Sequence, residues 1–296
     1  MVGKFFGEFL LERSVIDAAQ LRRAVALQGR VNLKLGTIAL DRGLLSAAQI
    51  AAIRAAQRSA DRRFGELAVD LGLLTPEQLE ALLDAQQSDR VHLGEALLQV
   101  GAVTEAQLET ELAAFKAQEK RATDEYRQAL GRLPHGDLVA TFVESAVDMM
   151  VRLAAIQAKV RGVRREALMP AADDLVIAQT ADVGEEVAYA CSFPANLAAA
   201  IASAMEASPP AEIAAYVVDV IAEFVNILVG NAVVRARERG RPCAPPEVLA
   251  GPGPGEGSGV PAPARDAEIV TLATTVEPCR LAVWAAGNGA RRREQA

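Results

Sequence analysis

The sequence is poor in aromatic residues and has no excess of positive charge. Aromatic residues make up 4% of the 296 residues, with one Trp and three Tyr. Carbohydrate-binding surfaces and base-stacking platforms depend on aromatic faces, so this composition argues against both. The net charge of −7 also leaves the chain without the broad basic face that binds a nucleic acid polymer.

Cysteine and histidine are equally scarce. The three cysteines, Cys191, Cys243 and Cys279, lie far apart in the sequence, so no Cys-x-x-Cys pair for a zinc or redox site is present. A sparse, odd number of cysteines is typical of a reducing compartment. The two histidines, His92 and His135, give little support to a Ser-His or Cys-His hydrolase. Neither a P-loop nor a cluster with metal-ligand spacing occurs, so we expect no metal site.

Long apolar runs and a signal peptide are also missing. The longest run without a charged residue is 187–205, and it contains Pro194 and Asn196, so a strand followed by a helix explains it better than a membrane span. The first 13 residues carry charges and lack the apolar core of a secretory signal. We therefore expect a cytoplasmic protein without membrane insertion. Hydrophobic residues make up 51% of the chain, enough for the cores of about two domains.

Four repeats occupy the first third of the chain. They start at residues 5, 34, 63 and 92, so their period is 29 residues. Nine residues after each start stands a Gly, or a Ser in the first repeat, and Gly accepts the left-handed cap of a helix without a Cβ clash. These residues are Ser14, Gly43, Gly72 and Gly101. A short helix is therefore predicted to end at this position in each repeat.

Each repeat also carries a capping box, in which one side chain accepts from a free backbone N–H and the side chain three residues later reaches back. The four pairs are Asp17 and Gln20, Ser46 and Gln49, Thr75 and Gln78, and Thr104 and Gln107. Each repeat is thus predicted to be a helix, a capped turn and a second helix. One such unit cannot bury its apolar side alone, so we expect the four to pack together as an all-α domain.

The repeats resemble the cyclic-di-GMP-binding motif of MshEN-type domains, which stand at the N-terminus of type II secretion and pilus ATPases. That motif begins Arg-Leu-Gly, continues with a spaced Gly and Gln, and recurs with the same period. The third repeat fits it best and the second fits with Lys in place of Arg. The resemblance implies cyclic-di-GMP as a ligand, held by Lys34, Leu35, Gly36, Arg63, Phe64, Gly65, Gly72, Gln86 and His92.

The residue types of the motif suit a ligand with phosphates and purine rings, although not all repeats keep the motif. Arg or Lys can meet a phosphate or stack on a purine, and Gly lets backbone N–H groups approach closely. The first repeat, however, has Phe5 and Ser14 at the Arg and Gly positions, and the fourth has His92 and Phe115 at the Arg and Gln positions. A helical packing domain that binds no ligand therefore remains an alternative.

The rest of the chain predicts a second domain of mixed structure. We expect a repeat domain over 1–118, a charged linker over 119–135, the second domain over 136–288 and a basic tail over 289–296. Long helices are predicted at Asp137–Ile156 and Glu212–Arg239, a shorter one at Pro194–Ala207, and strands at Ala167–Thr180, Glu186–Phe193, Cys243–Ala250, Ala267–Val276 and Arg280–Ala286. The Gly- and Pro-rich stretch Gly251–Ala264 is predicted to be a connection. The fold class is therefore a two-domain α+β protein whose second domain places two long helices on a β-sheet.

The helix at Glu212–Arg239 contains the most specific signal. Asp219, Glu223, Asn226 and Gly230 are spaced by four, three and four, so they share one face. Most other sides of this helix are apolar, as in a largely buried helix. A narrow polar stripe on such a helix is either a solvated edge or a working surface.

This stripe resembles the signature helix of the CheX/CheC chemotaxis phosphatases, and the similarity covers about half of the chain. In that family the substrate is the aspartyl phosphate of a CheY-like receiver, which supplies the Mg²⁺. The resemblance implies that Glu223 contacts the receiver's lysine, that Asn226 orients the attacking water, and that Asp219, Gly230 and Asn231 dock the receiver. It also implies a homodimer that carries no cofactor of its own.

Two-site relatives repeat the motif on the first long helix, where this chain has Glu144 and then Val147 instead of Asn. We therefore expect one site per chain. Two alternatives stay open: a non-catalytic adaptor, and a cyclic-di-GMP effector whose second domain only mediates partner binding or dimerisation. If the second domain is a phosphatase, our hypothesis is that the repeat domain localises or gates it.

Overall fold

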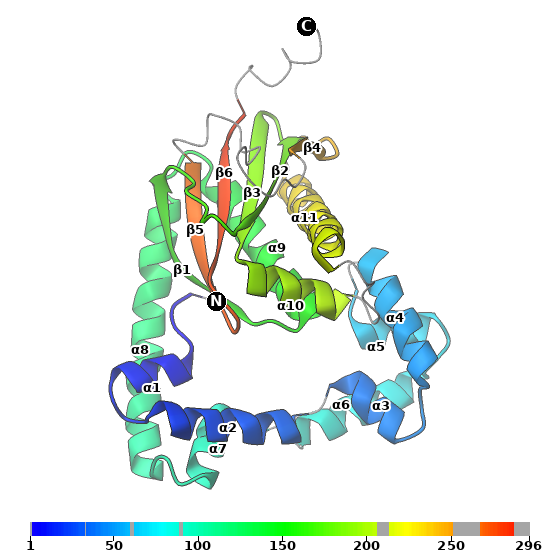
Figure 1. The fold of residues 1–296 in the computed structure, drawn as a ribbon, viewed down its shortest axis with the longest axis vertical. Coiled ribbons are helices and arrows are strands. Elements are labelled where there is room, and N and C mark those ends of the chain that lie inside the picture. Colours follow the sequence, from blue (N-terminus) through cyan, green and yellow to red (C-terminus); the bar gives the residue numbers. More distant parts are fainter. Residues whose placement is uncertain are drawn as a thin grey trace, which may run out of the picture. The chain divides into compact units, whose positions relative to one another are not determined.

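The computed structural model describes residues 2–32, 34–59, 62–88, 91–205, 213–250 and 267–286. The chain divides into two compact units, which are coloured along the sequence in Figure 1. The N-terminal unit is Lys4–Lys120, and the C-terminal unit joins Met1–Gly3 to Arg121–Ala296. The predicted two-domain α+β class is confirmed: the first unit is helical and the second combines helices with an antiparallel sheet.

The N-terminal unit consists of short and long helices in alternation. They are α1 (Phe6–Glu12), α2 (Ala18–Val31), α3 (Leu35–Asp41), α4 (Ala47–Ser59), α5 (Phe64–Asp70), α6 (Pro76–Ser88), α7 (Leu93–Gln99) and α8 (Glu105–Leu130). The predicted end of each short helix is confirmed, because Gly43, Gly72 and Gly101 have φ of 68°, 65° and 66° and Ser14 takes φ of 55°. A β-carbon at such angles is strained, which explains why Gly stands there in three repeats.

All four predicted capping boxes are formed. In each, the Asp, Ser or Thr oxygen accepts from the backbone N–H of the Gln at 2.7, 3.3, 3.2 and 3.3 Å in chain order. The Gln side chain accepts from the backbone N–H of the capping residue at 2.8, 2.8, 2.8 and 2.9 Å. Local sequence therefore determines where each second helix begins.

We expected the four repeats to pack together around one core. They form two nested pairs instead, each with its own apolar cluster. The second and third repeats enclose one apolar cluster, which includes Ala39, Ile53, Leu67 and Leu82. The first and fourth repeats enclose another cluster, which includes Leu10, Ala24, Ala96 and Leu97. The physical reason is that two helix pairs already cover each other's apolar faces, so a shared core of four is not needed.

The spacing that the repeats share serves this pairing. The Gln28 amide donates to the carbonyl of Val91 at 3.1 Å, and the Gln57 amide donates to that of Arg62 at 3.3 Å. Each bond ties the second helix of one repeat to the start of its partner repeat. A Cβ on Gly65 would lie 2.4 Å from Leu79 Cδ1, so a larger residue here would displace the Leu79 side chain, and close helix packing favours glycine.

The C-terminal unit is a six-stranded antiparallel sheet with helices on one face (Figure 1). In chain order its elements are α9 (Gly136–Ala154), β1 (Ala158–Glu166), β2 (Leu175–Asp182), β3 (Glu186–Phe193), α10 (Ala195–Met205), α11 (Ile213–Glu238), β4 (Glu247–Ala250), β5 (Ala267–Thr274) and β6 (Cys279–Ala285). The strand order is β1-β5-β6-β3-β2-β4. The main core lies between this sheet and α9, α10 and α11.

Three expectations about this region need correction. The predicted linker 119–135 is helix as far as Leu130, because α8 continues and Tyr126 and Leu130 pack against the core of the C-terminal unit. The predicted strand at Ala167–Thr180 begins only at Leu175, and the strand β1 before it was missed. β1 has a charged, exposed end, as befits an edge strand, so it lacks an apolar signal. The connection Gly251–Ala264 and the tail 289–296 lie outside the described residues.

Helix α11 is long and apolar enough to cross a membrane, by length and composition, over Tyr216–Glu238. In the structure its apolar side belongs to the core, with Ile221, Phe224 and Leu228 fully buried against α9, α10 and the sheet. The polar stripe on its remaining side is what makes this helix a candidate for function.

Candidate functional site

The predicted polar stripe lies on the surface of α11. Asp219, Glu223 and Asn226 are exposed and Gly230 is half-buried, while the residues between them enter the core. One face of one rigid helix therefore carries two carboxylates, an amide and a residue without a side chain. The core packing of the helix fixes the spacing of these groups.

Asn231, for which the resemblance implies a docking role, does not share this face. It lies about 100° round the helix from Gly230 and about 120° from Asp219, because each residue turns about 100°. Its Nδ2 donates to Met149 Sδ of α9 at 3.2 Å. The side chain of Asn231 therefore takes part in packing α11 on α9.

Among the residues that the structure describes, Asn226 is the one member of the stripe whose side chain is hydrogen-bonded to the sheet. Nε2 of Gln179, from β2, donates to Asn226 Oδ1 at 3.4 Å. Gln179 is 2% exposed, so a buried amide lies directly beneath an exposed one. The sequence analysis missed Gln179; the signal for it is a single amide on the apolar side of a strand, between Ile177 and Ala181.

The two carboxylates of the stripe are unpaired among the described residues. Neither Asp219 nor Glu223 makes an ion pair or a hydrogen bond with any residue of the described ranges. An exposed carboxylate in this state keeps its full capacity to accept from a cation or from hydrogen-bond donors of another molecule.

The carboxylates of the neighbouring helix α9 are paired. Arg235 Nη2 lies 2.5 Å from Asp148 Oδ2 and Arg239 Nη2 lies 2.7 Å from Glu144 Oε2. A third ion pair joins Arg241 to Asp137 in the first turn of α9. The three arginines of this row of ion pairs all come from the end of α11 or the residues after it. The row runs antiparallel along the two helices and holds them side by side.

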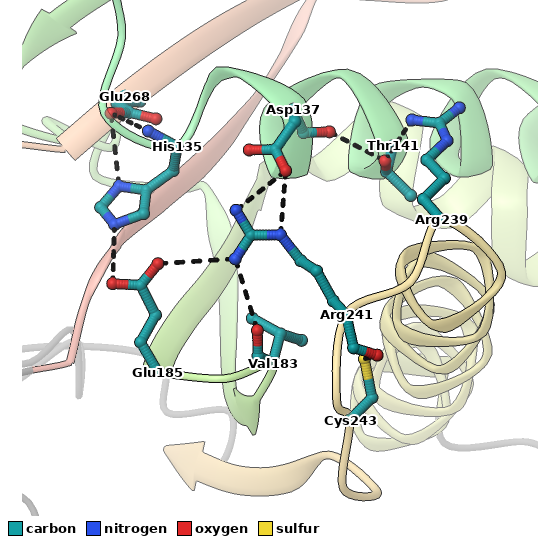
Figure 2. A network of polar contacts seen from close by, with 9 residues as sticks. All are labelled: His135, Asp137, Thr141, Val183, Glu185, Arg239, Arg241, Cys243 and Glu268. Carbon is teal, nitrogen blue, oxygen red and sulfur yellow. Dashed lines mark hydrogen bonds and ion pairs between the residues drawn. The ribbon is translucent and has the colours of Figure 1, made fainter.

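The third pair belongs to a wider network at the start of α9 (Figure 2). The Arg241 guanidinium lies between Asp137, at 2.9 Å, and Glu185, at 3.6 Å. The His135 ring lies between Glu185 and Glu268, at 3.6 and 3.3 Å. Glu268 is 2% exposed and also accepts from the backbone N–H of His135 at 3.0 Å. This network joins the first turn of α9, the β2–β3 turn and β5, and it has a structural role.

The cysteines offer no activated thiol. Burial raises the pKa of Cys279 to about 12 and raises that of Cys191 well above its usual value. Burial also raises the pKa of the partly exposed Cys243. A thiolate is the nucleophilic form of cysteine, so these environments disfavour thiol chemistry. Among the described residues no group of three or more His, Cys, Asp or Glu could hold a metal ion.

Residues 176–255 match a known family model. The family is the chemotaxis phosphatase CheX. The matched region contains β2, β3, α10 and α11, and so it includes Gln179, Glu223 and Asn226. The C-terminal unit is thus CheX-like over the part that builds the candidate site, as the sequence resemblance predicted. No curated protein matches the chain.

Solved structures of similar proteins cover about half of this chain. A CheX from Desulfovibrio desulfuricans has a TM-score of 0.40 and 16% identity, and the match covers 50% of this chain and 99% of that one. A CheX from Vibrio vulnificus has a TM-score of 0.40 and 17% identity, with 50% and 97% covered. The CheX-CheY-BeF3-Mg complex from Borrelia burgdorferi has a TM-score of 0.36 and 15% identity, with 49% and 96% covered.

The residues predicted to bind cyclic-di-GMP are divided between the two repeat pairs. Lys34 and Arg63 stand exposed just before α3 and α5, in the second and third repeats. His92 stands before α7 in the other pair. Within the first of these pairs the packing is reciprocal: Leu35 lies against Gly65, and Phe64 lies against Gly36. Gly72 is the exposed left-handed cap of α5 and Gln86 is half-buried in α6.

Proposed function

We propose that the C-terminal unit is a CheX-type phosphatase that hydrolyses the aspartyl phosphate of a CheY-like receiver. The observation that carries the proposal is the exposed pair of Glu223 and Asn226 on one face of α11, inside the region that matches the chemotaxis phosphatase model. Water attacks phosphorus, the bond from phosphorus to the aspartyl oxygen breaks, and inorganic phosphate and a free carboxylate result.

The two side chains have different parts in this proposal. An acyl phosphate is already activated, so holding a water in line supplies much of the rate. The amide of Asn226 suits this task because it donates and accepts hydrogen bonds without a charge that repels phosphate oxygens. The free carboxylate of Glu223, one turn away, docks on the receiver's lysine and sets the register. The receiver, not this chain, holds the Mg²⁺.

The test is the lifetime of phosphate on the CheY-like receivers of the source organism, measured with Mg²⁺. We expect wild-type protein to shorten that lifetime on one receiver, and Asn226→Ala to abolish the effect while receiver binding persists. Asn196→Ala is the matched control, since its exposed amide on α10 contacts Glu277, and it should keep full activity. If no receiver loses phosphate faster, the protein is a non-catalytic adaptor, and Glu223 and Asn226 are then dispensable.

We further propose that cyclic-di-GMP binds the N-terminal unit and regulates the phosphatase. Support comes from the pairing of the second and third repeats, the two that best match the MshEN-type motif, which places Lys34 and Arg63 in one pair of repeats. Titration calorimetry with cyclic-di-GMP tests this, with the linear dinucleotide as the matched ligand control. Arg63→Ala should remove binding, whereas Arg23→Ala, which removes an exposed arginine of α2 outside the predicted ligand set, should retain it. Absence of heat with wild-type protein would leave the repeats a packing domain.

Both activities are proposed for a cytoplasmic homodimer. The dimer is expected to form through the C-terminal unit, and sedimentation equilibrium of the full chain measures it directly. A monomer at micromolar concentration would remove the dimer from the proposal and leave the phosphatase test unaffected.

A further inference from the structure

Gln179 occupies a position where the strand otherwise turns apolar side chains toward the helices. Alternate residues of a strand share a face, and Ile177 and Ala181, on either side of Gln179, belong to the main core. Tyr189, which pairs with Gln179 on the neighbouring strand β3, belongs to that core as well. Burying an amide that is 2% exposed costs folding free energy unless its polar atoms are hydrogen-bonded.

The hydrogen bonding of Gln179 is directed at the candidate site. Nε2 donates to Asn226 Oδ1 at 3.4 Å, while Oε1 is buried and has no partner among the described residues. The side chain is therefore not part of an internal network that would explain its presence. A bond of this length is common for catalytic groups before their partner binds.

The bond decides which end of the Asn226 amide faces outward. An amide has a donor end and an acceptor end, and an exposed Asn on a helix otherwise exchanges between rotamers. With Oδ1 held by the sheet, Nδ2 points away from the core. The buried amide thus selects one orientation of the exposed one.

We propose that Gln179 is a positioning residue for Asn226: the Gln179 side chain orients the amide of Asn226 from below, so that Nδ2 faces the receiver's phosphate site and the second lone pair of Oδ1 stays available to the attacking water. The role rests on the proposed phosphatase function for its kinetic consequence. The orientation of the Asn226 amide is a property of the protein alone and is measured without any receiver.

The first experiment follows the side-chain NH₂ signals of Asn226 by NMR in the full, deuterated chain. Asn226→Asp assigns the signals, and Gln179→Met keeps the length of the side chain while removing its amide. We expect Gln179→Met to move the Asn226 signals and lower their order parameter. Ile177→Val, a change of similar size on the same face of β2, should leave both unchanged. Unmoved Asn226 signals in folded Gln179→Met would overturn the proposal.

The second experiment separates positioning from a merely structural role by kinetics. At saturating receiver, Gln179→Met should lower kcat about threefold to tenfold, the range that the loss of one neutral hydrogen bond gives. KM for the receiver should stay within about twofold, because Gln179 is buried and does not touch the partner. An unchanged kcat would overturn the proposal, and so would an equal effect of Ile177→Val.

Two further results separate this proposal from the phosphatase function. If wild-type protein shortens no phosphate lifetime, the phosphatase proposal fails and the NMR result still decides the role of Gln179. If Gln179→Met does not fold, the wild-type order parameter of the Asn226 amide decides: a value near that of rigid backbone, about 0.85, supports anchoring, and a value below about 0.6 contradicts it.

Discussion

Helices α9 and α11 lie side by side and both expose acidic residues, yet those residues are in opposite states. On α9 the side chains of Glu144 and Asp148 are 50% and 51% exposed, and each is bound to an arginine at or just after the end of α11. On α11 Asp219 and Glu223 are also exposed, and among the described residues they bind nothing. Residue type and exposure are thus alike, and only the partner differs.

The difference shows how one helix pair divides its charges between structure and recognition. Three arginines at and after the end of α11 neutralise the acidic side of α9 and fix the two helices antiparallel. The earlier part of α11 has no arginine to pair with its carboxylates, so these remain available to another molecule. The two helices also differ in the Glu-x-x-Asn spacing. It is incomplete on α9, where Val147 follows Glu144, and complete on α11, where Asn226 follows Glu223.

The largest expected effect comes from reversing one charge in each region. Glu223→Lys should weaken binding of the phosphorylated receiver about a hundredfold, because it sets a positive charge against the receiver's lysine. The thermal midpoint should hardly change, since Glu223 has no partner within the described part of the chain. Titration of labelled receiver and a thermal melt measure the two quantities.

Glu144→Lys is the matched reversal on α9. It should lower stability by about 1 kcal/mol, since it removes an exposed ion pair and adds a repulsion beside Arg239. Receiver affinity should remain that of the wild type. Equal losses of affinity in the two variants would show that both helices face the receiver, against the division described above.

A second prediction completes the motif on α9. Val147→Asn creates the Glu-x-x-Asn spacing, but Val147 is 8% exposed and lies in the main core. The amide should therefore lower the free energy of unfolding by about 1–3 kcal/mol without creating a second site. Urea denaturation measures the first effect, and phosphate loss in an Asn226→Ala background measures the second. Recovered phosphatase activity in that double variant would contradict the prediction.

Much of this architecture could be predicted from local sequence. The capping boxes, the left-handed glycines and the 29-residue period define the helices of the N-terminal unit, because each depends on residues only a few positions apart. The exposed stripe from Asp219 to Asn226 is likewise set by the helical period within α11. Predictions of this kind survive because neighbours in sequence are neighbours in space.

What could not be predicted depends on distant partners. Similar repeats present similar faces, so the sequence alone does not decide that the first repeat pairs with the fourth. Gln179 and Asn226 are 47 positions apart, and nothing local to β2 identifies the amide's partner. The pairing of Arg235, Arg239 and Arg241 with α9 likewise appears only when the two helices lie antiparallel.

A third prediction concerns the size of a single paired contact. The double-mutant cycle of Arg239→Met and Glu144→Gln should give a coupling of about 0.5 kcal/mol, because both side chains are about half exposed and such pairs contribute little. Arg239→Met alone should cost more than Glu144→Gln, because Nη1 of Arg239 also donates to Thr141 at 2.6 Å. Urea denaturation of the four proteins measures the cycle. A coupling near zero would leave Thr141 as the main partner of Arg239.

The smallest expected effect is at Asp219, one turn before Glu223 on the same face. Because Asp219 is exposed and unpaired within the described ranges, its charge acts on the receiver through solvent, and Asp219→Asn should slow association about twofold to threefold without altering dissociation. Stopped-flow association at low and high salt measures this, and the two proteins should converge as salt screens the charge. Asp148→Asn, a matched loss of charge on α9, should not change the association rate, since Arg235 already neutralises that carboxylate. A salt-independent difference at Asp219 would instead mean direct contact with the receiver, which is the docking role that the resemblance implies for Asp219.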